Sequence, residues 1–253
     1  MIILLAPSKT MNFQPVSSLS VPTTMPHFYA QAVEIVHTVC QMDDLAPLMR
    51  TSRTIADKTK SAYARWGEKN NPSLYAYVGD VYKGFYAPTL TSDGITWAQK
   101  HVFILSGLYG ALRPLDLISA YRLEMKAKLP VGPAKNLYEF WGNKVAKYVG
   151  DAADGVICVL SSDEYAKVVT AHTGCRVITP VFLDKKPNGM IGTVPIYSKM
   201  MRGVMARWLI DNHIDTPERI IEFSMYGYSY DAGHSIDDRP AFYREVMTPL
   251  RFN

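Results

Sequence analysis

The chain has 253 residues, 48% of them apolar, which is enough to form a packed core within one domain. Its formal net charge of +4 is compatible with a polyanionic partner but too small to demonstrate one. No apolar run approaches the roughly 18 residues of a membrane span. The opening Met1–Ala6 lacks the cationic leader of a secreted protein, so we expect a cytoplasmic protein without a membrane partner.

The first predicted element is a buried strand, Ile2–Leu5, which ends before a loop that exposes Ser8, Lys9 and Thr10. A polar stretch, Met11–Pro26, predicts a surface loop. No feature marks a domain boundary, so we predict one mixed α/β domain over residues 1–253. Periodicity and β-branched runs predict helices at Phe28–Cys40, Leu45–Arg50 and Thr54–Trp66, a strand at Val102–Leu105, a helix at Leu137–Val149, strands at Val156–Leu160 and Val177–Pro180, and a helix at Tyr197–Asn212.

The segment Arg50–Arg65 concentrates positive charge. It carries five basic residues against one acidic residue, and this excess of four equals that of the whole chain. The helix predicted within it begins with a capping pattern formed by Thr54 and Asp57. Its interior face is predicted to consist of Ile55, Thr59, Ala62, Tyr63 and Trp66. The basic residues fall on both flanks of that face, so they do not form a single row.

The segment Leu45–Trp66 also has the outline of a helical hairpin, with a basic turn at Arg50–Arg53. Such a hairpin can present backbone N–H groups to a phosphate, and neighbouring Lys and Arg attract DNA whatever its sequence. The turn lacks the Gly-x-Gly that is usual in DNA-binding helix-hairpin-helix motifs. A plain hairpin with a solvated basic face is therefore an open alternative.

The stretch Ile104–Lys128 combines glycines, a proline and paired charges behind an apolar strand. Its glycines allow the backbone of Ser106–Gly110 to approach a ligand closely, which predicts a ligand loop. Pro114 forbids a long helix, so the charged residues around it lie on an ordered, irregular segment. If Tyr121–Met125 is extended, Arg122 and Glu124 share one side, either as an ion pair at a cleft or as a structural salt bridge. The charged residues of this irregular segment are Arg113, Asp116, Arg122 and Glu124.

Eight ordered blocks of the sequence resemble the YaaA peroxide stress resistance family, also described as UPF0246-type. The resemblance extends over essentially the whole chain. The blocks are Leu5–Thr10, Gly79–Tyr82 with Gly84, Leu105–Gly110, Leu112–Leu117, Tyr121–Met125, Leu137–Gly142, Ser162–Tyr165 and Pro180–Leu183. The resemblance implies a bacterial cytosolic protein of the oxidative stress response that binds duplex and branched DNA through a positively charged cleft. It also implies a single α/β domain of unusual, cantaloupe-like topology with a helix-hairpin-helix element, for which Leu45–Trp66 is the candidate.

The segment Tyr197–Trp208 is similar to the family's Lys-x-x-Arg-Gly-x-Met-x-Arg block. On a helix, Lys199 and Arg202 share a face and can grip one phosphate, whereas Arg207 lies about 140° away from Arg202. The alternative is an ordinary surface helix with an apolar face packed inward. The two interpretations are compatible, because the cations and the apolar residues can occupy different faces. That apolar face would consist of Met200, Val204 and Trp208.

The leading hypothesis is a non-enzymatic protein that binds double-stranded or branched DNA largely without sequence preference and protects against peroxide damage. No obligate protein partner is indicated. The predicted DNA contacts are Arg50, Arg53, Lys58, Lys60, Lys83, Arg113, Arg122, Lys126, Lys128, Lys199, Arg202 and Arg207.

The second hypothesis is an enzyme that acts on a nucleobase, nucleotide or damaged nucleic acid around Tyr109, Arg122 and Glu124. Such a pocket would use Glu124 or Glu164 for proton transfer, Tyr109 for stacking and an Arg for phosphate binding. No known catalytic spacing is present, so no catalytic residue is assigned. The candidate pocket residues are Ser8, Lys9, Tyr82, Ser106, Tyr109, Arg122, Glu124 and Glu164.

A third hypothesis, binding of iron or another metal, has little support in the sequence. Its six histidines are scattered, and Cys40, Cys158 and Cys175 form no Cys-x-x-Cys pair. We therefore predict no metal, no cofactor and no disulfide framework. Cys158 lies in an apolar run and is predicted to be a core residue; the alternative, a peroxide-sensing thiol, requires an exposed and electropositive setting.

Overall fold

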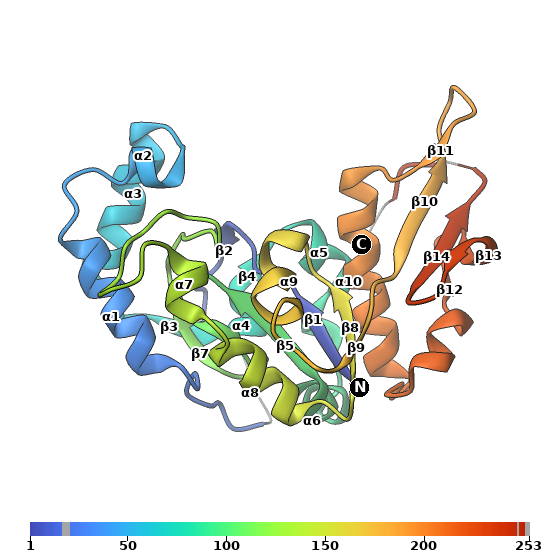
Figure 1. Ribbon diagram of the computed structural model, residues 1–253, viewed down its shortest axis with the longest axis horizontal. Coiled ribbons are helices and arrows are strands. Elements are labelled where there is room, and N and C mark those ends of the chain that lie inside the picture. Colours follow the sequence, from blue (N-terminus) through green and yellow to red (C-terminus); the bar gives the residue numbers. More distant parts are fainter. Residues whose placement is uncertain (17–20, 247, 251–253) are drawn as a thin grey trace.

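The structure is a computed structural model that describes residues 1–16, 21–246 and 248–250. It has a mixed α/β architecture, in which two five-stranded sheets lie on either side of the long helix α10, Pro195–Asp211 (Figure 1). Residues 17–20 of the predicted loop Met11–Pro26 fall outside the described residues. Within the described part of the chain, no helix is both long and apolar enough to cross a bilayer.

The first sheet has the strand order β6-β5-β1-β8-β9, and all of these strands except β6 run parallel. Their buried apolar side chains are typical of a parallel sheet that is covered on both faces. The chain leaves β1 to form β5 on one side and returns to form β8 on the other. Ligands bind at such a reversal, beyond the carboxyl ends of the strands. The strands are β1 (Ile2–Leu5), β5 (Val102–Ser106), β6 (Gly110–Leu112), β8 (Val156–Leu160) and β9 (Arg176–Ile178).

Short helices and two small strand pairs surround this sheet. The paired strands are β2 (Thr10–Met11) with β4 (Tyr77–Val78), and β3 (Asn70–Pro72) with β7 (Leu117–Ser119). The helices are α1 (Tyr29–Cys40), α2 (Ala46–Met49), α3 (Arg53–Ala64), α4 (Ser73–Ala76), α5 (Asp80–Phe85), the 3-10 turn η1 (Ala87–Thr89), α6 (Ser92–His101), α7 (Leu137–Trp141), α8 (Lys144–Ala152) and α9 (Asp163–Thr170).

The second sheet has the order β11-β10-β14-β13-β12 and packs against the opposite side of α10 (Figure 1). Strands β10 and β14 are parallel, and the other neighbours are antiparallel. A buried ion pair between Arg244 and Asp184 joins β14 to β10 at 2.6 Å. The elements are β10 (Val181–Lys185), β11 (Ile191–Gly192), the 3-10 turn η2 (Pro217–Glu222), β12 (Ser224–Met225), β13 (Tyr228–Ile236) and β14 (Arg239–Arg244).

The structure confirms the predicted strands at Ile2–Leu5 and Val156–Leu160 and corrects two helix predictions. The helix predicted at Leu137–Val149 is two helices, because Gly142 adopts a positive φ of 49° between them. Helix α3 begins at Arg53, after the N-cap Ser52, instead of at the predicted capping residue Thr54.

The predicted interior face of α3 is wrong at one edge. Ile55 is 38% exposed, whereas its neighbour Ala56 is buried together with Thr59 and Tyr63. The buried stripe is therefore rotated by one residue at the start of the helix. A rule based on hydrophobicity alone selects the larger Ile55, but in the folded chain the small Ala56 faces the core.

The loop predicted to bind a ligand, Ser106–Gly110, is instead packed inside the protein. Ser106 and Tyr109 are almost completely buried. A Cβ atom on Gly107 would lie 2.5 Å from the carbonyl oxygen of Leu123, so this glycine serves close backbone packing. The expectation that this loop approaches a ligand is therefore wrong. Gly107 instead lets the backbone of Leu123 approach the turn after β5, and Gly110 packs against aromatic and apolar side chains.

Helices α5 and α10 cross at backbone contact. A Cβ atom on Gly203 would lie 1.8 Å from the carbonyl oxygen of Val81, and one on Gly84 would lie 2.2 Å from that of Met200. Only glycine permits so close an approach at both positions. This crossing places the N-terminal half of α10 beside the carboxyl end of β1.

Candidate nucleic-acid interface

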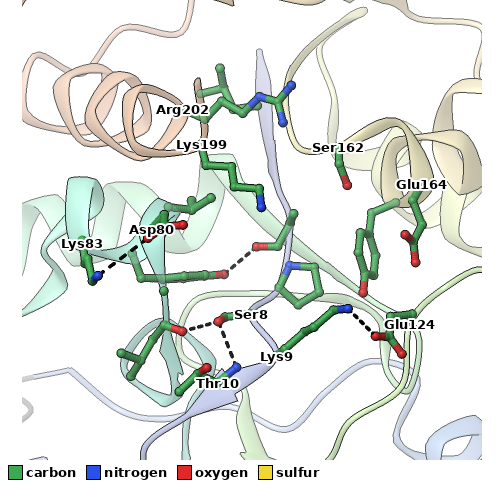
Figure 2. A pocket seen from close by; sticks show the side chains of 18 residues that line it. Ser8, Lys9, Thr10, Asp80, Lys83, Glu124, Ser162, Glu164, Lys199 and Arg202 are labelled. Carbon is green, nitrogen blue, oxygen red and sulfur yellow. Dashed lines mark hydrogen bonds and ion pairs between the residues drawn. The ribbon is translucent and has the colours of Figure 1, made fainter. Parts of the chain in front are cut away.

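A pocket of about 680 Å³ lies beyond the carboxyl ends of β1 and β8. The segment after β1 forms its floor, the start of α5 and the segment after β8 form two walls, and α10 forms a third (Figure 2). Its polar lining residues are Ser8, Lys9, Thr10, Asp80, Tyr82, Lys83, Glu124, Ser162, Glu164, Tyr165, Lys199 and Arg202.

The wall formed by α10 is cationic. Lys199 and Arg202 point from this helix into the pocket, as their shared helical face predicts (Figure 2). Neither side chain has a hydrogen bond or an ion pair with another described residue. Burial lowers the pKa of Arg202, and the nearby carboxylate of Asp163 opposes this shift. Arginine keeps its charge under such conditions, so both groups are available to an anion.

The opposite side of the pocket carries carboxylates that are already paired with cations. The Nζ atom of Lys9 lies 2.7 Å from Glu124 Oε1, and the Nη2 atom of Arg122 lies 3.8 Å from the same oxygen. The Nζ atom of Lys126 lies 3.1 Å from Glu164 Oε2. The predicted ion pair of Arg122 and Glu124 is therefore confirmed. The Nε atom of Arg122 is buried and has no hydrogen-bond partner among the described residues.

The backbone around Ser8 is held by its own hydroxyl group. Ser8 Oγ donates a short hydrogen bond to the carbonyl oxygen of Val78 and accepts one from the amide of Thr10 at 3.1 Å. Tyr82 donates its hydroxyl proton to the carbonyl oxygen of Ala6 at 3.0 Å. These contacts tie the segment after β1 to β4 and α5, so Lys9 is presented from an anchored loop.

The aromatic residues of the pocket remain neutral. Burial raises the pKa of Tyr82 well above its ordinary value, and burial also raises that of Tyr165, with smaller contributions from Tyr121, Glu164 and Glu124. Neither phenol therefore supplies a negative charge near neutral pH. The two rings provide neutral, partly apolar wall surface.

Two further hollows adjoin the main pocket, because Lys9 and Glu124 line all three. A small one is lined by Arg122, and one of about 690 Å³ is lined by Arg50, Lys126 and Lys128. We call these three hollows together the basic groove. Its cationic lining residues come from five separate parts of the chain and are Lys9, Arg50, Lys83, Arg122, Lys126, Lys128, Lys199 and Arg202.

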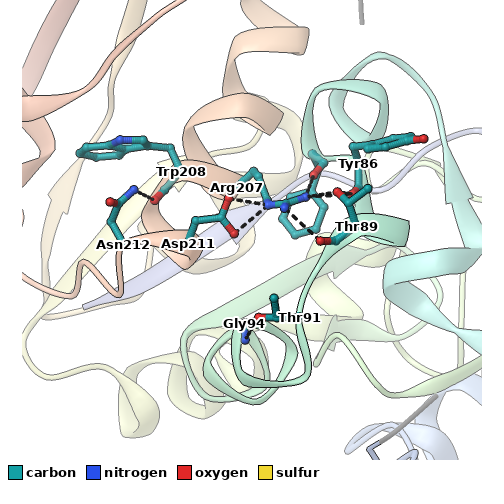
Figure 3. Close-up of polar contacts among 9 residues, drawn as sticks. Tyr86, Thr89, Thr91, Gly94, Arg207, Trp208, Asp211 and Asn212 are labelled. Carbon is teal, nitrogen blue, oxygen red and sulfur yellow. Dashed lines mark hydrogen bonds and ion pairs between the residues drawn. The ribbon is translucent and has the colours of Figure 1, made fainter. Parts of the chain in front are cut away.

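Five of the predicted DNA contacts do not line the basic groove. Arg113 lies 3.7 Å above the ring of Phe103 and donates to the carbonyl oxygen of Lys100 at 2.8 Å. Lys60 donates to the carbonyl oxygen of Asp43 at 2.9 Å. Arg207 is anchored to the end of α5 and η1 (Figure 3). The five residues are Arg53, Lys58, Lys60, Arg113 and Arg207.

The predicted helical hairpin is present as α2 and α3, joined by a tight turn. Arg50 adopts the left-handed conformation, with a φ of 48°, where the helix-hairpin-helix motif usually has glycine. The amide of Thr51 bonds back to the carbonyl oxygen of Ala46 at 3.3 Å. The turn therefore forms without glycine, and Arg50 projects toward the groove.

The candidate pocket residues of the enzyme hypothesis separate into two groups. Six of them line the basic groove: Ser8, Lys9, Tyr82, Arg122, Glu124 and Glu164. The other two, Ser106 and Tyr109, are core residues. Tyr109 accepts hydrogen bonds from Trp66 Nε1 at 3.1 Å and from the amide of Ser119 at 3.0 Å. Its ring is buried and lines none of the three hollows, so the structure does not bring it into the pocket as the enzyme hypothesis expects.

Sequence reasoning missed four polar lining residues, Thr10, Asp80, Ser162 and Tyr165. A signal for two of them was present. Ser162 and Tyr165 follow the buried strand β8 as Ser8 and Lys9 follow β1, and the carboxyl ends of neighbouring parallel strands meet at one edge.

The cysteines give no sign of a reactive or metal-binding centre in the described residues. Cys158 is completely buried in β8, and burial raises the pKa of its thiol to about 12. Its prediction as a core residue is confirmed, and a sensing role is contradicted because the thiolate is not formed. Cys175 is partly exposed and Cys40 is exposed. Among the described residues, no three His, Cys, Asp or Glu side chains are grouped closely enough to hold a metal ion.

Comparisons with known proteins agree with the resemblance seen in the sequence. Residues 1–234 match the model of a family described as peroxide stress protein YaaA. A UPF0246 protein of Bordetella pertussis is 40% identical over 258 residues, which cover 97% of this chain and 99% of the relative. UPF0246 proteins of Shewanella oneidensis and Polynucleobacter asymbioticus are 39% and 38% identical, over 98% and 96% of this chain and 100% and 98% of the relatives. The chain therefore belongs to the peroxide stress protein YaaA family.

Proposed function

We propose that this protein binds duplex or branched DNA through the basic groove, largely without sequence preference, as part of the peroxide stress response. The observation that supports this most directly is the convergence of eight cationic side chains from distant parts of the chain. They extend from Lys9 after β1 to Arg202 on α10. A spread of Lys and Arg along a groove neutralises successive phosphates, whichever bases lie between them.

The hairpin of α2 and α3 supports the same reading at one end of the groove. Arg50 lines the hollow there, on the turn that leads from α2 into α3, whereas no residue of α3 itself lines it. We propose that this hairpin acts as the helix-hairpin-helix element expected for the family. The arrangement of two sheets around α10 is compatible with the family's cantaloupe-like topology.

A salt titration tests this proposal. The logarithm of the affinity for a short duplex of mixed sequence should fall linearly with the logarithm of the salt concentration. Replacing both Lys199 and Arg202 by Ala should reduce the slope by up to about 1.8, because each lost phosphate contact contributes about 0.9. The loss should be similar on duplexes of unrelated sequence. A flat salt response of the unchanged protein would contradict DNA binding through phosphate contacts.

A charge-matched control separates the groove from net charge. Lys100 and Lys147 are exposed and line none of the three hollows. Replacing both by Ala removes the same two positive charges and should leave the slope unchanged. If the control lowers affinity as much as the groove variant does, binding depends on overall charge and the assignment to the groove is wrong.

A second candidate function is an enzyme that acts on a nucleobase, a nucleotide or damaged nucleic acid. The observation that favours it is the position of Glu124 and Glu164 in a pocket at the carboxyl ends of parallel strands. Incubation with damaged and undamaged oligonucleotides, followed by mass spectrometry, would reveal a released base or an altered nucleotide. A product that disappears with Glu164→Gln would establish this function, and unchanged substrates would exclude it for the compounds supplied.

A further inference from the structure

We infer that the main pocket holds a single nucleotide that has left the base stack of the bound DNA. This inference rests on the proposed DNA binding and specifies what the pocket adds to the groove. The size of the pocket is the first argument. Its volume of about 680 Å³ lies within the range of small-molecule sites, roughly 300 to 1,000 Å³. A double helix is far too wide to enter it, whereas one extruded nucleotide can.

The distribution of charge in the pocket is the second argument. Lys199 and Arg202 line one wall, and neither has an acceptor among the described residues. Glu124 and Glu164 lie on the other side, where Lys9 and Lys126 pair with them, so this side carries little net charge. The positive charge that lacks an ion pair is therefore concentrated on the wall formed by α10. A nucleotide has the matching asymmetry, with an anionic phosphate at one end and N–H donors on the base edge at the other.

The surface between these two ends is the third argument. Pro7, Val78 and Leu160 line the pocket together with the neutral phenols Tyr82 and Tyr165. Such apolar and aromatic surface suits the faces of an unstacked base. The hydroxyl group of Ser162 also points into this space and can donate a hydrogen bond (Figure 2).

The carboxylates further restrict the base. An unprotonated carboxylate only accepts hydrogen bonds, so it pairs with exocyclic amino groups and ring N–H groups. Cytosine, guanine and adenine carry an exocyclic amino group, and thymine does not. The pocket should therefore prefer an unpaired nucleotide with an amino group over an unpaired thymine nucleotide.

Binding to matched oligonucleotides tests the inference. Two duplexes that share one strand are compared by fluorescence anisotropy at one salt concentration; in the first the second strand is fully complementary, and in the second it carries one additional, bulged cytosine. The bulged duplex should bind at least about 10-fold more tightly, because its nucleotide does not need to be unpaired first. A duplex with a bulged thymine should fall between them. Equal affinities for paired and bulged cytosine duplexes would overturn the inference.

A variant that fills the pocket provides a second measurement. Val78 lines the pocket and is 37% exposed, so Val78→Trp occupies the space without removing a charge. It should keep the affinity for paired DNA within about twofold and lose the preference for the bulge. Val33→Trp, on the exposed side of α1, is the matched control and should behave as the unchanged protein does.

The outcomes also separate this inference from the proposed function. If Val78→Trp folds, as circular dichroism would show, and still prefers the bulged duplex, the nucleotide does not occupy the pocket and the inference fails. Salt-dependent binding without any preference for the bulge also refutes it, while the proposed function stands. If neither duplex binds the unchanged protein, the proposed function fails as well.

Discussion

The two halves of helix α10 carry similar cations in opposite situations. In the N-terminal half, Lys199 and Arg202 face the pocket without an acceptor among the described residues. In the C-terminal half, Arg207 donates to the carbonyl oxygen of Tyr86 at 3.0 Å, to Thr89 Oγ1 at 2.7 Å and to both carboxylate oxygens of Asp211 at 2.8 Å (Figure 3).

This difference shows that two cations on one helix can have different roles, because the donors of Arg207 are used within the described part of the protein and those of Lys199 and Arg202 are not. Arg207 donates to the carbonyl oxygen of Thr89 at the end of η1 and adds a donor to that of Tyr86, which also accepts from Thr89. Two carboxylates of the chain also differ in their surroundings. Glu124 borders the pocket, whereas Asp116 fixes a turn by accepting from Thr24 Oγ1 and from the amide of Arg113 at 2.7 Å each.

The largest expected effect concerns Gly203, which lies between the two halves of α10. Gly203→Ala should reduce the free energy of unfolding by at least about 3 kcal/mol, because the new methyl group would overlap the backbone of α5. Urea denaturation measures this loss. Gly174→Ala is the control, since a Cβ atom there meets nothing within 4 Å and its φ is not in the left-handed region. Equal stability of the two variants would show that α5 and α10 do not touch as described.

Replacing each of the two arginines of α10 by Gln in turn tests the comparison directly. Arg207→Gln should lower the free energy of unfolding by about 2 kcal/mol, because charged hydrogen bonds to partly buried carbonyls are lost. It should leave the salt dependence of DNA binding unchanged. Arg202→Gln should do the reverse, with a stability change within about 0.5 kcal/mol and a slope lower by about 0.9. If both variants affect stability and binding alike, the division of α10 into two halves is wrong.

Neutralising the carboxylate at the pocket should have a smaller effect. Glu124→Gln removes the partner of Lys9, so the free energy of unfolding should fall by about 1 kcal/mol. The affinity for fully paired DNA should stay equal or rise up to about threefold, because one negative charge leaves the basic groove. Anisotropy titrations at low salt measure this. A strong loss of affinity would indicate that Glu124 positions Lys9 for its phosphate contact.

A pH dependence is expected for the turn that Asp116 holds. Burial raises the pKa of Asp116 to about 6, although hydrogen bonds from Thr24 and Arg113 oppose the shift. The folded state then binds the proton more tightly than the unfolded state, so this residue's contribution to stability is lost as the pH rises from about 4 to about 6. Relative to the native protein, Asp116→Asn should gain about 2 kcal/mol over that interval. Urea midpoints at pH 4, 5, 6 and 7 would reveal it, and a constant difference would contradict it.

Much of the local structure was determined by the sequence itself. The apolar, β-branched runs Ile2–Leu5 and Val156–Leu160 are strands with those bounds, because a strand buried on both faces requires such residues. The common face of Lys199 and Arg202 followed from helical periodicity alone. Predictions from local sequence failed where contacts between distant segments decided the structure. Helix α3 buries Ala56 instead of Ile55, and the glycines at 107 and 110 allow close packing instead of approaching a ligand.

Only the tertiary structure decided which charges form the site. Lys9, Lys126 and Arg202 are far apart in the chain and meet because β1 and β8 are neighbours and because Gly203 lets α10 approach α5. Arg207 belongs to the same sequence block as Arg202 but is used to hold the backbone of η1. Periodicity shows which side of a helix a residue occupies. What lies opposite that side depends on the packing of elements distant in sequence, and that packing separates a binding residue from a structural one.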